Sequence, residues 1–473
     1  MTKTTTRWLA LALLAIGRLA YALPVELKDS NGTRYQVNTE VSPLISDSLA
    51  SGAVTNATFQ GTVTVTDYWY VETFFGGTST FTTKYTVNNV PMTPAFVGFN
   101  GIVITGINGT TLGTPLVFNT GQPLAGEDCP DSNNVNQELL FPSQSFTGAG
   151  YDLAVTRKVF VPHNKNWLRW LNIFTNNGTS DAQLAVTLRG LIASGSQTKI
   201  TATNSGGSTI NASTLWFTSA QTVPQGEHSY EPRIGYVLQN TGGAVAASSV
   251  GINSVGQAAF SYNLNIPAGQ SQTLLTFVTV QGKTSQAKST CEDIVTNPLP
   301  SDAIKCMNEV ALSQVVNFPK ITPPTLTNAT VKLKFNKTDQ DTVQWKGKVT
   351  IGAGIDLDGL PVVVDFGGNE QTFILNKSGS ANNGGGNKFN LNAKLQNGVT
   401  KAKNVSFSFN MKGDLQSTLA AYGLTDATVS NVPVTIPLTF TVGTQGAGWG
   451  VDQAFTYNAT QGKSGTAKAP PSS

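Results

Sequence analysis

The stretch Val155–Gly190 reads VTRKVFVPHNKNWLRWLNIFTNNGTSDAQLAVTLRG, and it decides the fold class. Its runs are rich in β-branched and aromatic residues, and the turn dipeptide Asn177-Gly178 separates two of them. The pattern predicts strands at Leu153–Val161, Trp167–Thr175 and Ala182–Leu191. Because no helical period lies between these runs, the pattern favours antiparallel strands.

The same strand pattern continues on both sides of this stretch. In Thr62–Val71, Val63, Val65, Trp69 and Val71 fall on one face, and the Thr and Tyr residues fall on the other. At least ten strands without intervening helices predict a large antiparallel β-sandwich over residues 58–283. The remaining strand predictions are Ser79–Val87, Gly101–Ile107, Thr214–Thr218, Ile234–Gln239, Ala258–Leu264 and Thr273–Val280.

The period changes at Thr284. Ser285–Val295 and Ser301–Val316 are predicted as helices, so residues 284–318 form a helical connector. Residues 319–328 follow as a proline-rich linker. The overall prediction is an all-β protein in which two antiparallel β-sandwich domains are joined by this connector.

Residues 329–463 alternate again and predict an immunoglobulin-like sandwich of about seven strands. Pro433 and Pro437 share one face of Val432–Val442, which indicates an edge strand. One short helical segment is predicted, with Asp414 as its cap and Gly423 at its end. Residues 464–473 are predicted to be a disordered tail.

The amino-terminal end has the pattern of an export signal. Lys3 and Arg7 precede an apolar run, and Ala20-Tyr21-Ala22 resembles a cleavage site, so residues 1–22 are predicted to be a signal peptide. Residues 23–57 form a polar lead-in with one strand candidate, Arg34–Val37. We expect a secreted or extracytoplasmic protein without a transmembrane segment, because no other apolar run is long enough.

Charge argues against a nucleic-acid partner. The chain has 30 basic and 27 acidic residues, and three of the basic residues lie in the signal, which leaves 27 of each sign. Within residues 326–473 there are 13 basic residues, all Lys, against 9 acidic ones. A surface without Arg is weak in phosphate recognition, so the simplest interpretation of these lysines is solubility.

The three cysteines fit export. Cys291 and Cys306 lie close together in the connector, and we predict a disulfide between them. Cys129 is left over in an acidic loop, as a free thiol, an intermolecular partner or a competitor for one of the other two.

Two groups of residues are candidate sites. Aromatic rings can stack on sugars, and the aromatic residues with the best prospect of exposure are Tyr68, Tyr70, Trp170 and Trp449. The densest polar cluster contains Glu227, His228, Tyr230 and Glu231, which have the side chains of a glycosidase or lyase. Consecutive loop residues rarely converge on one substrate, so a structural loop is favoured and no catalytic residue is assigned.

Two acidic groups carry oxygen ligands of the kind that bind calcium. Glu127, Asp128 and Asp131 form one acidic group, and Asp356 with Asp358 form another. Neither fits a twelve-residue calcium loop, and Asp358-Gly359 is more simply a turn. We therefore predict no metal site and no cofactor.

Two stretches carry a family resemblance. Tyr151–Gly190 resembles a β-sandwich module of large exported bacterial proteins, and its strands are similar to those of galactose-mutarotase-like supersandwiches, which occur beside sugar-active enzymes. Val362–Lys468, from VVVDFGGNEQTFILNKSG to GKSGTAK, is similar to an uncharacterised domain of exported bacterial proteins. The resemblance implies a modular, all-β, extracytoplasmic protein and brings no catalytic motif.

Three functions remain open from the sequence. The first is a secreted, non-enzymatic structural or adhesive protein, with a glycan or a surface protein as partner. The second is a carbohydrate-binding module or a weakly active sugar-processing sandwich. The third is a calcium-stabilised surface-layer component.

Overall fold

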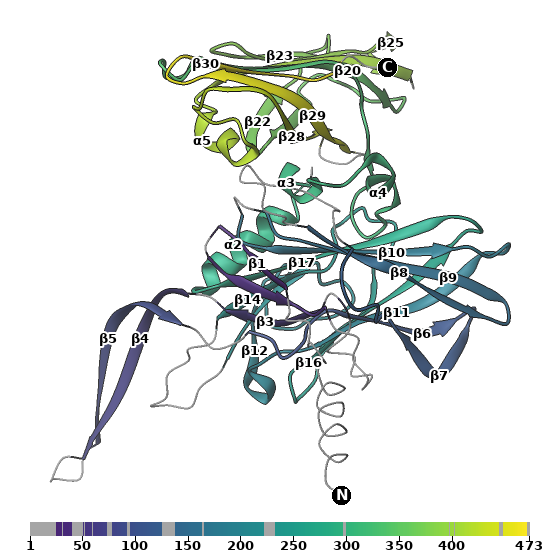
Figure 1. Cartoon of the computed structure of the whole chain (residues 1–473), viewed down its shortest axis with the longest axis vertical. Coiled ribbons are helices and arrows are strands. Elements are labelled where there is room, and N and C mark those ends of the chain that lie inside the picture. Colours follow the sequence, from purple (N-terminus) through teal and green to yellow (C-terminus); the bar gives the residue numbers. More distant parts are fainter. Residues whose placement is uncertain are drawn as a thin grey trace, which may run out of the picture.

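The protein is all-β, as predicted, with two sandwiches and a short helical segment between them (Figure 1). The structure is a computed structural model. It describes residues 25–30, 32–39, 51, 53–58, 60–72, 78–91, 95–124, 138–162, 165–221, 232–296, 299–396, 398–401, 403–443 and 448–470. The predicted signal peptide lies outside these residues. The predicted domain bounds remain predictions, although the two sandwiches have separate hydrophobic cores.

The N-terminal sandwich packs a seven-stranded sheet on a five-stranded one. The seven-stranded order is β12-β13-β14-β17-β10-β9-β8, and the five-stranded order is β15-β16-β11-β6-β7. All of their strand pairs are antiparallel, as in hairpin-connected sheets. The strands are β6 (Gly101–Ile107), β7 (Thr110–Val117), β8 (Glu138–Gly148), β9 (Tyr151–Phe160), β10 (Leu168–Asn176), β11 (Ala182–Leu191), β12 (Thr198–Thr203), β13 (Trp216–Gln221), β14 (Arg233–Val237), β15 (Ala247–Ile252), β16 (Gln257–Ile266) and β17 (Ser271–Gln281).

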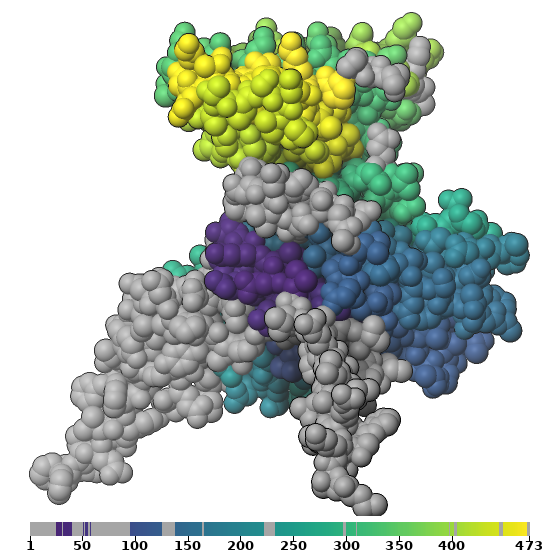
Figure 2. Space-filling view, in the orientation of Figure 1, coloured from purple at the N-terminus to yellow at the C-terminus, as the bar shows by residue number. Residues whose placement is uncertain are grey.

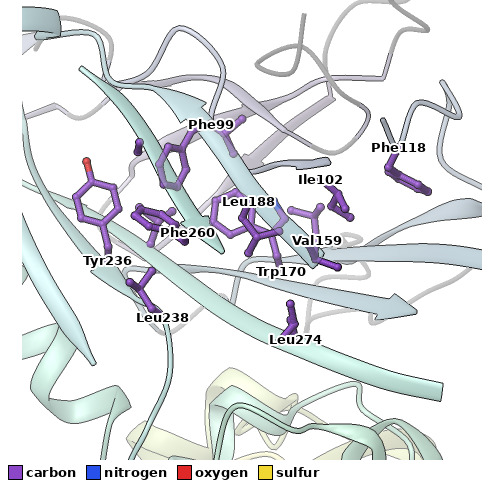
Figure 3. Close-up of a cluster of buried hydrophobic side chains, with 14 of the residues drawn as sticks. Phe99, Ile102, Phe118, Val159, Trp170, Leu188, Tyr236, Leu238, Phe260 and Leu274 are labelled. Atoms are coloured by element: carbon purple, nitrogen blue, oxygen red, sulfur yellow. The ribbon is translucent and has the colours of Figure 1, made fainter. Parts of the chain in front are cut away.

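Aromatic side chains fill the space between these two sheets (Figure 3). Phe99 lies 6.0 Å from Trp170 and 5.4 Å from Tyr236, measured between ring centroids. Tyr236 stacks on Phe217 at 4.4 Å. Burying rings of this size supplies a large part of the core's hydrophobic stabilisation.

The polar lead-in also forms strands. β1 (Val25–Lys28), β2 (Arg34–Val37) and β3 (Val54–Thr58) make a three-stranded sheet, which confirms the predicted strand at Arg34–Val37.

Beyond the lead-in, β4 (Gln60–Glu72) and β5 (Thr78–Pro91) pair with each other in a long hairpin. That hairpin extends away from the N-terminal sandwich (Figure 1).

The helical connector is more broken than predicted. α2 (Thr284–Ile294) agrees with the first predicted helix, but the second is divided into α3 (Ser301–Ile304) and α4 (Glu309–Gln314). Between them the backbone of Cys306 takes a positive φ of 65°, which a continuing helix does not allow. α2 packs closely on β14, where a Cβ on Gly235 would lie 2.5 Å from the Cys291 Sγ.

The cysteine pairing predicted from the sequence is wrong. Cys291 is a free thiol buried against β14, and burial raises its pKa. Cys306 is disulfide-bonded, so its partner is a cysteine other than Cys291. Cys129 lies outside the described residues. The spacing of 291 and 306 was misleading because α2 turns the first thiol towards the sheet.

The C-terminal sandwich is one eleven-stranded sheet folded over its own core. Trp345 contacts Phe366 and Phe455 across this core, at 5.4 and 5.7 Å between centroids. Figure 2 shows this part as a distinct mass at one end of the molecule. Its main path is β22-β21-β28-β29-β30-β19-β20-β27-β24-β23, and the strands are β18 (Ile321–Thr322), β19 (Thr325–Leu333), β20 (Asp341–Ile351), β21 (Pro361–Phe366), β22 (Asn369–Ile374), β23 (Ser380–Gly384), β24 (Asn387–Asn392), β27 (Lys403–Gly413), β28 (Val429–Val442), β29 (Gly448–Thr460) and β30 (Ser464–Lys468), with the separate pair β25 (Leu395–Gln396) and β26 (Val399–Thr400).

Three predictions for this sandwich change. The strand number exceeds seven, and the immunoglobulin-like topology stays a prediction. The tail predicted to be disordered provides β30, because the small residues Gly465 and Ala467 fit between β19 and β29. β28 is an edge strand only in its proline-containing half, since Leu438–Val442 also pair with β21.

Candidate functional site

Trp170 and Trp449 do not form an exposed sugar platform. Trp170 is 0% exposed in the N-terminal core. Trp449 is 5% exposed, stacks on Phe440 at 5.2 Å, and belongs to β29 rather than to a glycine-rich loop. A buried ring has no free face for a pyranose, so both assignments are corrected.

The other predicted sites are only partly described. Tyr68 and Tyr70 lie in β4 opposite Thr82 and Thr80, but their side chains lie outside the described residues. Glu227, His228, Tyr230 and Glu231 also lie outside them, as do Glu127, Asp128 and Asp131.

The second calcium candidate is a turn. The Asp356 carboxylate accepts the backbone N–H of Asp358 at 3.0 Å, and Gly359 follows with a φ of 74°. In the described part of the chain, no three His, Cys, Asp or Glu residues are arranged to hold a metal ion. Likewise, no described helix is long and apolar enough to cross a membrane.

Charged side chains gather where the connector meets the two sandwiches, in a region we call the seam. Arg169 of β10 is fully buried and donates to Glu138 of β8 at 2.8 Å. Its Nη1 also donates to the backbone carbonyls of Ala303 and Lys305, both at 2.8 Å. Arg169 therefore ties the N-terminal sandwich to the connector, and it satisfies carbonyl groups exposed at the end of α3.

The C-terminal sandwich binds the other side of the same short segment. Asp365 of β21 accepts the backbone N–H and the hydroxyl of Ser301, at 2.8 and 3.0 Å. Asp452 of β29 accepts the N–H of Cys306 at 2.7 Å, and the Tyr422 hydroxyl donates to Asp302. α3 thus lies between the two sandwiches and is held by both (Figure 1).

Burial perturbs the titration of these groups. Burial, with the charge of Asp302 added, raises the pKa of Asp365 to about 6. Burial also raises the pKa of Asp452 and lowers that of Arg169. Perturbed groups often mark active sites, but here Asp365, Asp452 and Arg169 each hydrogen-bond to the connector backbone. Among the described residues, the Asp452 Oδ1 and the Arg169 Nε have no hydrogen-bond partner. The seam is therefore a joint. The sequence could not reveal it, because its residues are widely separated along the chain.

A hollow without charged residues in its described lining lies on the outer face of the five-stranded sheet. It has a volume of about 400 Å³ and is bordered by the β6–β7 hairpin, β11 and β16. Register shifts next to Gly106 and Ala185 bend the strands at this place, as β-bulges do. Its polar lining includes Thr105, Thr110, Gln183, Asn263 and Asn265. We call this site the amide hollow.

Its side chains are available to a ligand. The amides of Gln183, Asn263 and Asn265 are exposed, and they make no side-chain hydrogen bond to any residue in the described ranges. Each primary amide offers two donors and one acceptor, which suits neighbouring hydroxyl groups. Among the described residues, the lining contains no Asp, Glu, His, Lys or Arg, and its amides and hydroxyls can bind a ligand through hydrogen bonds. The sequence could not have indicated the amide hollow, because Thr and Asn residues are common throughout this chain.

Comparisons with known proteins find no matching family model and no matching curated protein. Among solved structures, a polysaccharide lyase aligns at 11% identity and a TM-score of 0.29, over 82% of this chain and 46% of that one. A galactose mutarotase-like protein from Lactobacillus casei aligns at 12% identity and a TM-score of 0.24, over 45% of this chain and 100% of that one. A putative aldose 1-epimerase from Escherichia coli K12 aligns at 9% identity and 0.24, over 55% and 98%.

These similarities are weak. The chain spans less than half of the lyase, and 32% of a putative kojibiose phosphorylase from the human microbiome. At TM-scores of 0.29 and below, they say nothing about what this chain binds. The residues of the chain itself have to carry any functional conclusion.

Proposed function

We propose that the protein is an exported, non-enzymatic glycan-binding protein whose amide hollow takes a neutral sugar. The observation that carries this proposal is the set of three exposed amides of Gln183, Asn263 and Asn265 around one hollow, none of which bonds to another residue that the structure describes. Its volume falls within the range of small-molecule sites. Export rests on the predicted signal peptide alone.

The chemistry of the hollow favours a neutral ligand. Amides and hydroxyls form hydrogen bonds with sugar hydroxyls, and there is no charged group in the lining to select an anion or a cation. The lining also contains no aromatic ring, so each sugar contact is weak. We therefore expect useful retention on polysaccharides, where many sites act together.

The test is affinity electrophoresis of the full mature chain through gels that contain neutral polysaccharides. The site variant is Gln183→Ala/Asn263→Ala. The matched control is Gln257→Ala, which removes an exposed amide from the same strand β16 outside the hollow. We expect one polysaccharide to retard the wild type and the control but not the site variant. Equal retardation of all three proteins, or of none, would refute the proposal.

The seam favours a second candidate, a structural or adhesive protein that holds two sandwiches at a set separation. Buried hydrogen bonds from both sandwiches to α3 support it. A rigid spacer should give the same small-angle scattering profile at low and high salt. A profile that changes with salt would contradict the spacer.

A further inference from the structure

The outer sheet of the C-terminal sandwich has one face covered with lysines. Strand alternation sends Val343, Trp345 and Val349 of β20 inwards, and leaves Lys346 and Lys348 exposed between them. Neighbouring strands repeat the pattern in register. The lysine face, as we call it, carries Lys332 of β19, Lys346 and Lys348 of β20, Lys412 of β27, Lys388 of β24 and Lys468 of β30.

The pairing register brings these lysines together across five strands. Lys468 lies opposite Thr330, which lies opposite Gln344, and Gln344 lies opposite Asn410. Asn410 in turn lies opposite Lys388. Adjacent strands are roughly 4.8 Å apart, so Lys468 and Lys388, four strands apart, are roughly 19 Å apart. In the next row Lys332 and Lys412 lie on either side of Thr342, two strands apart, and are therefore roughly 10 Å apart. This spacing is close to the screening length of physiological salt, so a bound polymer meets several of the charges at once.

Within the described ranges, no carboxylate pairs with this face. None of the six ammonium groups forms an ion pair or hydrogen bond with a residue that the structure describes. Three carboxylates of this sandwich are used elsewhere, since Asp341 and Asp365 are buried and Asp452 binds the connector. Residues 326–473 carry 13 Lys and 9 acids, a balance of 13 − 9 = +4.

Two hollows lie side by side on the face. One has a volume of about 540 Å³, and Lys332, Lys388, Lys412 and Lys468 are among its lining residues. The other has about 550 Å³, and it is lined by Lys346 and Lys348 with serines and asparagines. A Cβ on Gly386 would lie 3.2 Å from the Lys412 Cδ, so the absence of a side chain there makes room for the lysine stem.

We propose that the lysine face binds an acidic polysaccharide, a polymer of sugars that carry carboxylates. Lysines act as point charges for carboxylates, and the serines, threonines and asparagines between them are suited to sugar hydroxyls. Two adjacent hollows suit a chain longer than one sugar. This site is separate from the amide hollow and does not depend on it.

Two other polyanions fit less well. Nucleic-acid binding without sequence preference uses aromatic stacking, but Trp345, Phe389, Phe407 and Phe409 of these strands are all buried in the core. Residues 326–473 contain no arginine, so this sandwich has no guanidinium group to form two hydrogen bonds with a phosphate. The exposed positions are polar, so the face offers no apolar side chain to enter a bilayer.

The position of the face leaves room for a polymer. β20, β23 and β30 lie at the end of the molecule farthest from the N-terminal sandwich (Figure 1). The layer containing β28 and β29 contacts α3 instead. A long ligand on the lysine face therefore avoids both the connector and the amide hollow.

The test is the affinity of the full mature chain for polygalacturonate, with its neutral methyl ester as the reference polymer. The face variants are Lys332→Gln/Lys412→Gln and Lys346→Gln/Lys348→Gln. The matched control is Lys199→Gln/Lys283→Gln, which removes two exposed lysines, one in β12 and one at the start of α2, outside the lysine face. Single-stranded DNA and phosphatidylserine vesicles are the competing probes.

We expect binding to polygalacturonate but not to its ester, roughly tenfold weaker binding for each face variant, and unchanged binding for the control. Equal losses in the control, no binding at all, or tighter binding to DNA or vesicles would each overturn the proposal. Gln183→Ala/Asn263→Ala should bind polygalacturonate normally, and so a failure here is distinguishable from a failure of the neutral-glycan proposal.

Discussion

The seam and the lysine face both gather charged side chains, with opposite results. In the seam, Arg169 is fully buried and its guanidinium hydrogen bonds go to Glu138 and to backbone carbonyls. On the lysine face, five of the six lysines are exposed and Lys412 is half-buried, and none of the six has a carboxylate partner in the described chain. Pairing and burial make the first region a joint, and the lack of both leaves the second open to a ligand.

The largest expected effect comes from breaking the seam. Arg169→Leu removes the donor to the Glu138 Oε2 and to two carbonyls in the buried joint, while Lys158 still pairs with the Glu138 Oε1 at 2.8 Å. Removing one partner of a buried pair costs about 3–5 kcal/mol, so the free energy of unfolding should fall by that amount. Urea denaturation followed by tryptophan fluorescence measures it. A loss below about 1 kcal/mol would show that the seam is not a joint.

A second variant tests the close packing of α2 on β14, without changing any charge. Gly235→Ala places a Cβ 2.5 Å from the Cys291 Sγ and 2.6 Å from the Thr279 Cγ2. Such overpacking costs about 1–3 kcal/mol. Adding Cys291→Ala should restore part of this loss in the same urea titration. No recovery in the double variant would place the strain elsewhere.

The seam should also respond to pH. Asp365 has a folded pKa of about 6, above its unfolded value of about 3.9, so the folded state holds the proton more tightly. Its contribution to stability therefore rises as the pH falls through 6, by about 1 kcal/mol between pH 7.5 and pH 5. Urea titrations at both pH values measure it. Asp365→Asn should remove this share of the difference, and an unchanged pH dependence would contradict the assignment.

The smallest effect is expected on the lysine face. Lys346→Gln/Lys348→Gln removes two exposed charges without a partner, so the free energy of unfolding should change by less than about 0.5 kcal/mol. The same urea titration checks it. A loss comparable to that of Arg169→Leu would mean that these lysines support the fold, and the contrast between the two regions would disappear.

Local patterns predicted much of the fold. Alternating apolar residues located β9, β10 and β11 to within a few residues of their ends. The short helix after β27 was also predicted correctly in outline: Leu415, Leu419 and Tyr422 are buried, and Gly423 ends it with a φ of 86°. These features depend on neighbours in sequence, and so the sequence contains their signals.

The candidate sites were harder to predict. Asp414 looked like the helix cap, but the Asp341 carboxylate accepts the Leu415 N–H at 3.0 Å from another strand. Trp449 looked exposed among glycines, yet β18 pairs beside it and the core takes its ring. In both cases a residue distant in sequence satisfied the group, and no local pattern records that.

The sequence by itself determined the all-β class, the helical interruption and the balance of charge, because periodicity and composition are local properties. Only the tertiary structure decided which charges are buried and which are free. Strand register aligned the lysines of five strands on one face, and the packing of α3 brought Glu138, Asp365 and Asp452 to one joint. Burial and pairing are properties of contacts between distant segments, and those contacts exist only once the chain has folded.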